Sequence, residues 1–168
     1  MPKEKNLAAI EKEYNKLLSA FNKFKGSFDT DMRNVLQDDA NKIEKSLNKF
    51  DDLLKEFRKG NQDLTSIQRN FISYMNNSLE EITTSHQDLI TRANNIKSPS
   101  CTQKIKNYLA IAVECITKLY TAVAKLAGVL SEKISSSMTT VFKHFQKSAN
   151  AFTAPTAPSG DTQRPTNK

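Results

Sequence analysis

The chain has 168 residues and a formal net charge of +7, and 38% of its residues are hydrophobic. A chain of this length provides one domain with little room for a second. Its four glycines and five prolines supply few turns, which argues against a sheet protein, so the composition predicts an all-α fold.

Residues 3–28 are predicted to form the first helix, because apolar residues recur there every three or four positions. The resulting stripe is narrow, as in a coiled coil, and needs a partner helix to bury it. Gly26 is followed by Ser27, Asp29 and Thr30, which are good helix-capping residues, so we expect a kink or a break near Gly26. The stripe consists of Leu7, Ile10, Tyr14, Leu17, Phe21, Phe24 and Phe28.

Residues 36–57 repeat the same narrow stripe, and Arg58, Lys59 and Gly60 resemble a helix C-terminus. The apolar spacing nevertheless continues past Gly60, so a turn and a continuous helix are both open there. The next stripe ends at Ser98-Pro99, where proline disfavours helix, and the spacing of Ser100 and Gln103 predicts the cap of the last helix. It includes Leu64, Ile67, Phe71, Met75, Leu79, Ile82, His86, Leu89, Ala93 and Ile96.

The last predicted helix extends to about Ala151 and is apolar around almost its whole circumference near its centre. Glu114, Lys118, Lys125 and Glu132 fall within roughly 40° of one another on a helical wheel. Such a helix must be buried by neighbours or by lipid. The two narrow stripes before it are too small to cover its apolar surface. We therefore expect a partner or a membrane to contact Leu109, Ile116, Leu119, Val123, Leu126 and Leu130, with Lys118, Lys125 and Lys133 beside them.

Together these elements predict an elongated antiparallel bundle of three long helices with coiled-coil-like packing. A break near Gly26 would raise the number of helices to four. The bundle is expected to span residues 1–152, and residues 153–168 are expected to form a disordered tail rich in Pro and Thr.

The sequence predicts no enzyme, cofactor, metal site or small-molecule substrate. His86 is expected at the edge of the core and His144 on the surface, and the pairs Asp38-Asp39 and Asp51-Asp52 are expected on solvated helix faces. Metal binding requires converging Cys, His or carboxylate ligands, and no such spacing occurs.

The two cysteines, Cys101 and Cys115, lie in one predicted helix about 21 Å apart, too far for a disulfide. Unpaired thiols fit a reducing compartment. The first residues are too charged for a signal peptide, and no long uncharged apolar run predicts a transmembrane span. We therefore expect a cytoplasmic protein, with membrane association or export independent of a signal peptide as alternatives.

The favoured functional hypothesis is a non-catalytic scaffold or adaptor that binds a second copy of itself or another helical protein. A first alternative is a membrane-associated or membrane-inserting protein that presents the basic, apolar helix 103–150 to anionic lipid, since residues 101–150 carry seven basic and two acidic side chains. A second is an exported protein that acts on a partner cell, with the tail as its address. Specific nucleic-acid binding is not expected, because these cations are all lysines and no aromatic platform accompanies them.

Overall fold

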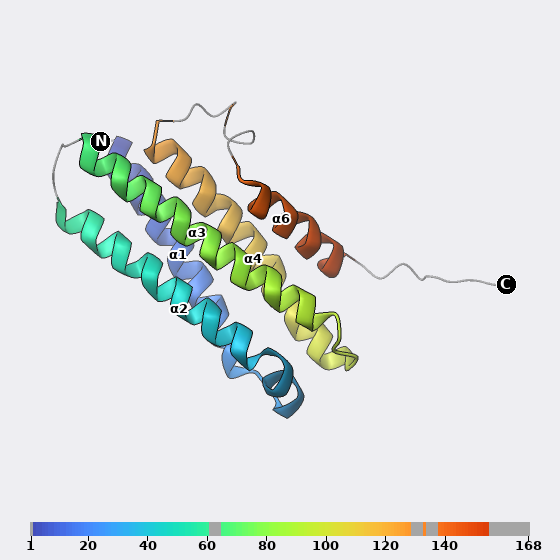
Figure 1. Ribbon diagram of the computed structural model, residues 1–168. Helices are drawn as coiled ribbons and strands as arrows, with labels where there is room; N and C mark the ends of the chain where they lie inside the picture. Colours follow the sequence, from blue (N-terminus) through green and yellow to red (C-terminus); the bar gives the residue numbers. More distant parts are fainter. Residues whose placement is uncertain (1, 61–64, 129–132, 134–137, 155–168) are drawn as a thin grey trace.

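A computed structural model describes residues 2–60, 65–128, 133 and 138–154 (Figure 1). Within these residues the chain forms helices and no strand, which confirms the predicted all-α class. The described helices are α1 (Pro2–Gly26), α2 (Thr30–Gly60), α3 (Thr65–Ala93), α4 (Pro99–Leu126) and α6 (Thr140–Thr153).

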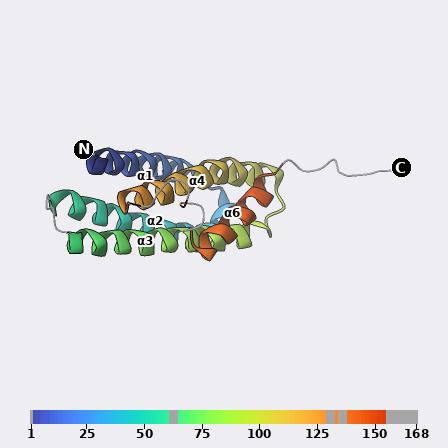
Figure 2. The same ribbon diagram turned by 90° about the horizontal axis from the view of Figure 1, so that it is seen from above.

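Helices α1 to α4 lie side by side along one long axis, and the chain reverses direction between consecutive helices (Figure 1). Seen from above, α1 and α4 form one layer and α2 and α3 form the other (Figure 2). The closest backbone packing is within each layer, between α1 and α4 and between α2 and α3. Helix α6 runs obliquely across α3 and packs on both α3 and α4 (Figure 2).

The apolar stripes predicted for α1 and α2 lie in the core, with Leu7 only partly buried. Between these two helices the rings of Tyr14 and Phe50 are 5.5 Å apart. The Tyr14 hydroxyl donates a hydrogen bond of 2.9 Å to the carbonyl of Leu47. Burial, followed by the nearby charges of Asp51 and Asp52, raises the pKa of Tyr14, so this hydroxyl keeps its proton and its hydrogen bond.

The break predicted near Gly26 is a turn between separate helices, and the start of α4 is attached to it. Asp29 Oδ1 accepts a hydrogen bond of 2.9 Å from the backbone N–H of Met32, which holds the pKa of Asp29 below its usual value. Cys101 Sγ donates to Asp29 Oδ2 at 3.2 Å, and Lys104 Nζ donates to the carbonyl of Ser27 at 3.0 Å. Two segments more than seventy residues apart in sequence therefore meet at this end of the bundle.

The second uncertain glycine also ends a helix: α2 stops at Gly60 and α3 starts at Thr65, with the segment between lying outside the described residues. The cap predicted at Ser100 for the last helix is two residues too late. Ser98 caps α4 by accepting a hydrogen bond from the backbone N–H of Cys101, and Pro99 occupies the first turn, where its missing N–H costs nothing.

The single last helix predicted to reach Ala151 is wrong, because α4 ends at Leu126 and α6 begins at Thr140. Gly128 follows α4 with φ of 85°, a conformation that glycine adopts easily after a helix. The Thr139 side chain then caps α6 by accepting a hydrogen bond of 3.1 Å from Phe142 N. The described part of the chain thus contains five helices instead of the predicted three or four. Of the predicted tail 153–168, Thr153 still belongs to α6, and residues 155–168 lie outside the described residues.

Candidate functional site

Most of the apolar residues predicted to face a partner or a membrane lie inside the single chain. Leu109, Ile116, Leu119 and Val123 of α4 are all 0% exposed. Leu126 is partly buried against the core, and Leu130 lies outside the described residues. In this packing these side chains are unavailable to a partner or to lipid.

Cover for α4 comes from α1, α3 and α6, and α6 is the element that the sequence analysis did not foresee. Phe142 and Phe145 of α6 are fully buried, and the rings of Phe142 and Tyr120 are 4.6 Å apart. The chain itself therefore covers the face that was expected to need a partner. An exposed apolar residue on α4 is Ile111, at 44%.

The lysines predicted to lie beside that face are on the surface. Lys118 donates a hydrogen bond of 3.0 Å to Glu114, one turn earlier on the same helix. This hydrogen bond lowers the pKa of Glu114, as a neighbouring cation should. Lys125 and Lys133 are exposed, so the cations are displayed while their apolar companions are buried.

His86 belongs to a polar cluster inside the core and not to its edge. Its side chain is 0% exposed. The carbonyl of Ile82, 2.8 Å from Nδ1, can only accept, so Nδ1 carries the proton and Nε2 accepts from the Tyr108 hydroxyl at 2.6 Å. Burial lowers the pKa of His86 to about 4, which keeps the ring neutral at pH 7. Sequence spacing located this histidine, but Tyr108 as its partner required the fold.

One carboxyl group and two thiols that could act chemically are also buried. Asp39 was expected on a solvated face, but it is 0% exposed and its Oδ2 lies 2.9 Å from Nε of Arg92. Burial raises the pKa of Asp39, and the Arg92 charge opposes that shift. Cys101 and Cys115 are unpaired and buried, and burial raises the pKa of Cys115 to about 11. A thiol that resists ionisation is a weak nucleophile.

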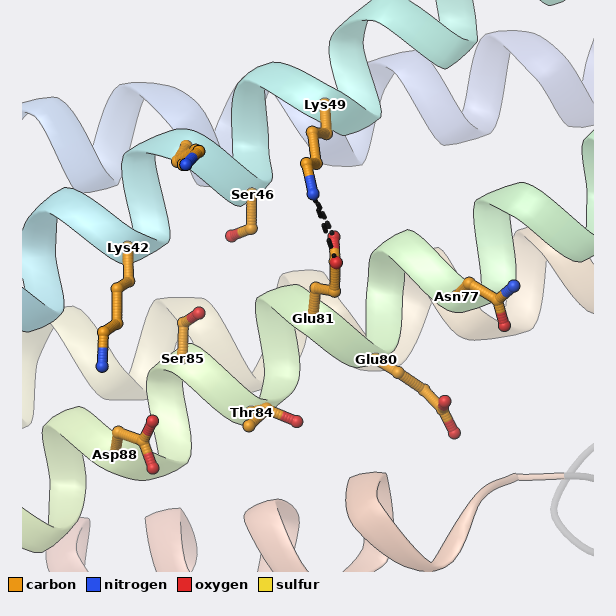
Figure 3. A pocket seen from close by; sticks show the side chains of 10 residues that line it. Lys42, Ser46, Lys49, Asn77, Glu80, Glu81, Thr84, Ser85 and Asp88 are labelled. Carbon is orange, nitrogen blue, oxygen red and sulfur yellow. Dashed lines mark hydrogen bonds and ion pairs between the residues drawn. The ribbon is translucent and has the colours of Figure 1, made fainter.

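An open groove follows the outer surface between α2 and α3, with a volume of about 590 Å³ (Figure 3). Figure 3 shows Lys42 and Lys49 extending from α2 toward α3, opposite Asp88 and Glu81. Lys49 Nζ lies 3.3 Å from Glu81 Oε1. The side chains that line the groove are Lys42, Lys45, Ser46, Lys49, Asn77, Glu80, Glu81, Thr84, Ser85 and Asp88.

The groove continues into a second hollow of about 360 Å³ between the same two helices. Leu53 and Tyr74 lie there, and Tyr74 is 54% exposed, more than any other large hydrophobic residue in the part of the chain that the structure describes. The floor is built from small side chains, since Ser46 and Ser78 are almost fully buried. Small residues at these positions allow the two helices to approach closely and leave the longer side chains as walls.

The sequence analysis did not identify this groove, although a signal was present. Lys42, Lys45 and Lys49 are spaced by three and four residues and so share one face of α2. Glu81 and Asp88 have the matching spacing of seven on α3. What the sequence could not show is that these two faces are neighbours, because that depends on which helices pack together.

The groove presents charges and hydrogen-bonding groups on rigid helices, which suits contact with a macromolecule. Among the described residues, no three His, Cys, Asp or Glu side chains form a group able to hold a metal ion. None of the described helices has the length and apolar character needed to cross a bilayer. Comparison with protein-family models, curated proteins and solved structures finds no match for this chain.

Proposed function

We propose that this chain is a non-catalytic helical scaffold or adaptor, and that the α2–α3 groove is its surface for binding another protein. The observation that carries the proposal is that the reactive side chains named above are buried, whereas charged side chains of the groove are exposed. His86 and both cysteines are buried. The groove exposes lysines of α2 and acidic residues of α3 beside the exposed ring of Tyr74. Protein interfaces favour such aromatic anchors within a polar rim.

Knobs-into-holes packing of the apolar stripes is part of this proposal. It is supported by the burial of the stripes of α1 and α2, whose residues recur every three or four positions. Rigid packing matters for a scaffold because it holds the groove walls at fixed spacing. We also propose a reducing compartment such as the cytoplasm, which is supported by the two unpaired cysteines.

The proposed contact surface can be tested by site-specific photo-crosslinking in the cells that produce the protein. A photoreactive residue replaces Asn77, which is exposed in the groove, and in the matched control it replaces Ala110, which is exposed on α4. We expect a defined protein adduct from position 77 that disappears when Glu81→Lys is added. Equal background from both positions would overturn the assignment of the α2–α3 surface.

A membrane-associated role is the second candidate, and α6 is the feature that favours it. This helix carries Lys143, His144 and Lys147 and no acidic residue, with Phe142 and Phe145 on its opposite face. The exposed cations of this helix suit an anionic lipid surface, and the buried Phe142 and Phe145 reach lipid only if α6 leaves the bundle. Co-sedimentation with anionic but not with neutral vesicles, lost in a Lys143→Glu/Lys147→Glu variant, would support it, and absence of binding to both would remove it. The exported role remains a prediction from the tail alone.

A further inference from the structure

The two walls of the groove carry charges of opposite sign. Lys42 and Lys49 belong to the α2 wall, and Glu81 and Asp88 belong to the α3 wall. Figure 3 shows that Lys42 lies across from Asp88 and Lys49 across from Glu81. Each lysine and its acidic counterpart therefore lie at the same position along the helix axes.

These charges are only partly compensated within the described part of the chain, since Lys42 and Asp88 have no close ion pair but both act on the buried carboxyl group of Asp39. Lys49 and Glu81 form an ion pair whose side chains are 56% and 51% exposed, and solvent screens such a pair strongly. Among the described residues, neither Lys42 nor Asp88 has an oppositely charged group within 4.0 Å that forms a salt bridge with it. The groove therefore retains unused charge of both signs, which a purely acidic or purely basic ligand would match on one wall only.

A second copy of this chain provides both signs at the required heights. A two-fold axis parallel to the helices turns the second copy so that its α3 faces the first copy's α2, with heights unchanged. Each lysine then meets an acidic residue, and the same contact occurs twice because a two-fold interface is self-complementary. An axis perpendicular to the helices would instead place α2 against α2, where rows of lysines repel each other.

The same arrangement gives the exposed aromatic ring a partner. Tyr74 on α3 and Leu53 on α2 line the same hollow, so the parallel axis brings Tyr74 of each copy against Leu53 of the other. We propose that a second copy of this chain occupies the α2–α3 groove about a two-fold axis parallel to the helices. This inference rests on the proposed function, which assigns the same surface to protein binding.

Charge-swap variants and sedimentation analysis test the arrangement. Wild-type protein is expected to form dimers whose dissociation constant rises with salt. The Lys42→Glu/Lys49→Glu variant and the Glu81→Lys/Asp88→Lys variant should each dimerise at least about tenfold more weakly alone. When the two variants are mixed, opposite charges face each other again, and heterodimers should form within about threefold of the wild-type affinity.

A Lys12→Glu/Lys125→Glu variant is the matched control for the lysine swap, because it lowers the net charge by the same amount at exposed positions of α1 and α4, and it should still dimerise. Circular dichroism confirms folding, and if the double variants unfold, the single pair Lys49→Glu and Glu81→Lys serves instead. A monomer at all concentrations in low salt, or dimers that ignore the swaps, would overturn the proposal. A monomer that still gives a groove-specific adduct from position 77 with a different protein would leave the proposed function standing.

Discussion

Helix α4 and the α2–α3 groove differ in both composition and exposure. The central residues of α4 are apolar around most of the helix, and α1, α3 and α6 cover them. The groove is lined mainly by charged and hydroxyl side chains, and the close view shows no described helix lying over it (Figure 3).

This difference shows what an apolar circumference measures in a small helical protein. It indicates how much of the helix surface other helices of the same chain must cover. In this protein α6 provides part of that cover for α4. A contact surface for another molecule is better identified from polar residues that are matched in position across two neighbouring helices. Each prediction below changes one side of the comparison and leaves the other intact.

The largest expected effect is on the enclosed side. Leu119→Ala removes a side chain that is 0% exposed, so the free energy of unfolding should fall by about 2–5 kcal/mol through lost burial and a residual cavity. Chemical denaturation measures the change. The matched control, Ile111→Ala, alters a residue of the same helix that is 44% exposed and should cost less than about 1 kcal/mol. Equal costs would show that α4 is not enclosed.

The second effect is a loss of stability in acid that depends on His86. Its pKa is about 4 in the folded chain and 6.5 when unperturbed, so the unfolded chain binds the proton first as pH falls. The stability that depends on neutral His86 is therefore fully present well above pH 6.5 and is lost progressively down to about pH 4, by roughly 3 kcal/mol.

Urea denaturation at several pH values measures this loss. A His86→Met/Tyr108→Phe variant removes both hydrogen-bonding partners and should flatten the pH dependence over that interval. The control His144→Gln removes a histidine that is exposed on α6, and it should retain the wild-type dependence. An unchanged slope in the double variant would contradict the assignment to His86.

The burial of the apolar stripes of α1 and α2 was predictable, because apolar residues that recur every three or four positions all lie on one face of a helix. The division of the last helix was missed because Gly128 alone costs only about 1 kcal/mol in a helix. The burial of Asp39 was also missed, since it depends on the position of Arg92 on another helix. The groove was beyond sequence reasoning for the same reason, because two solvated faces become one surface only after packing.

A smaller effect is expected at the cap that begins α6. Thr139→Ala removes the acceptor for the backbone N–H of Phe142, which should lower the free energy of unfolding by about 1 kcal/mol. Thr139→Ser keeps the hydroxyl and should restore most of it. Hydrogen exchange of α6 amides reports whether the loss is local, and unchanged exchange in the alanine variant would argue against the cap.

The smallest effect on stability is expected on the open side. Lys49→Ala breaks an ion pair whose two side chains are about half exposed, so the free energy of unfolding should change by less than about 1 kcal/mol. Dimer affinity should nevertheless fall severalfold in sedimentation experiments. A large loss of stability with unchanged association would reverse the comparison and make the groove a structural element.

The pairing of α1 with α4 has a consequence for synthesis on the ribosome. Helix α1 meets its main packing partner only after α4 has been translated, and α4 starts more than seventy residues after α1 ends. Until then the apolar stripe of α1 packs only lightly on α2, where the ring of Phe50 meets Tyr14. Distant pairing of this kind slows folding and prolongs the exposure of apolar surface, so chaperone dependence during translation should be greatest before α4 is complete.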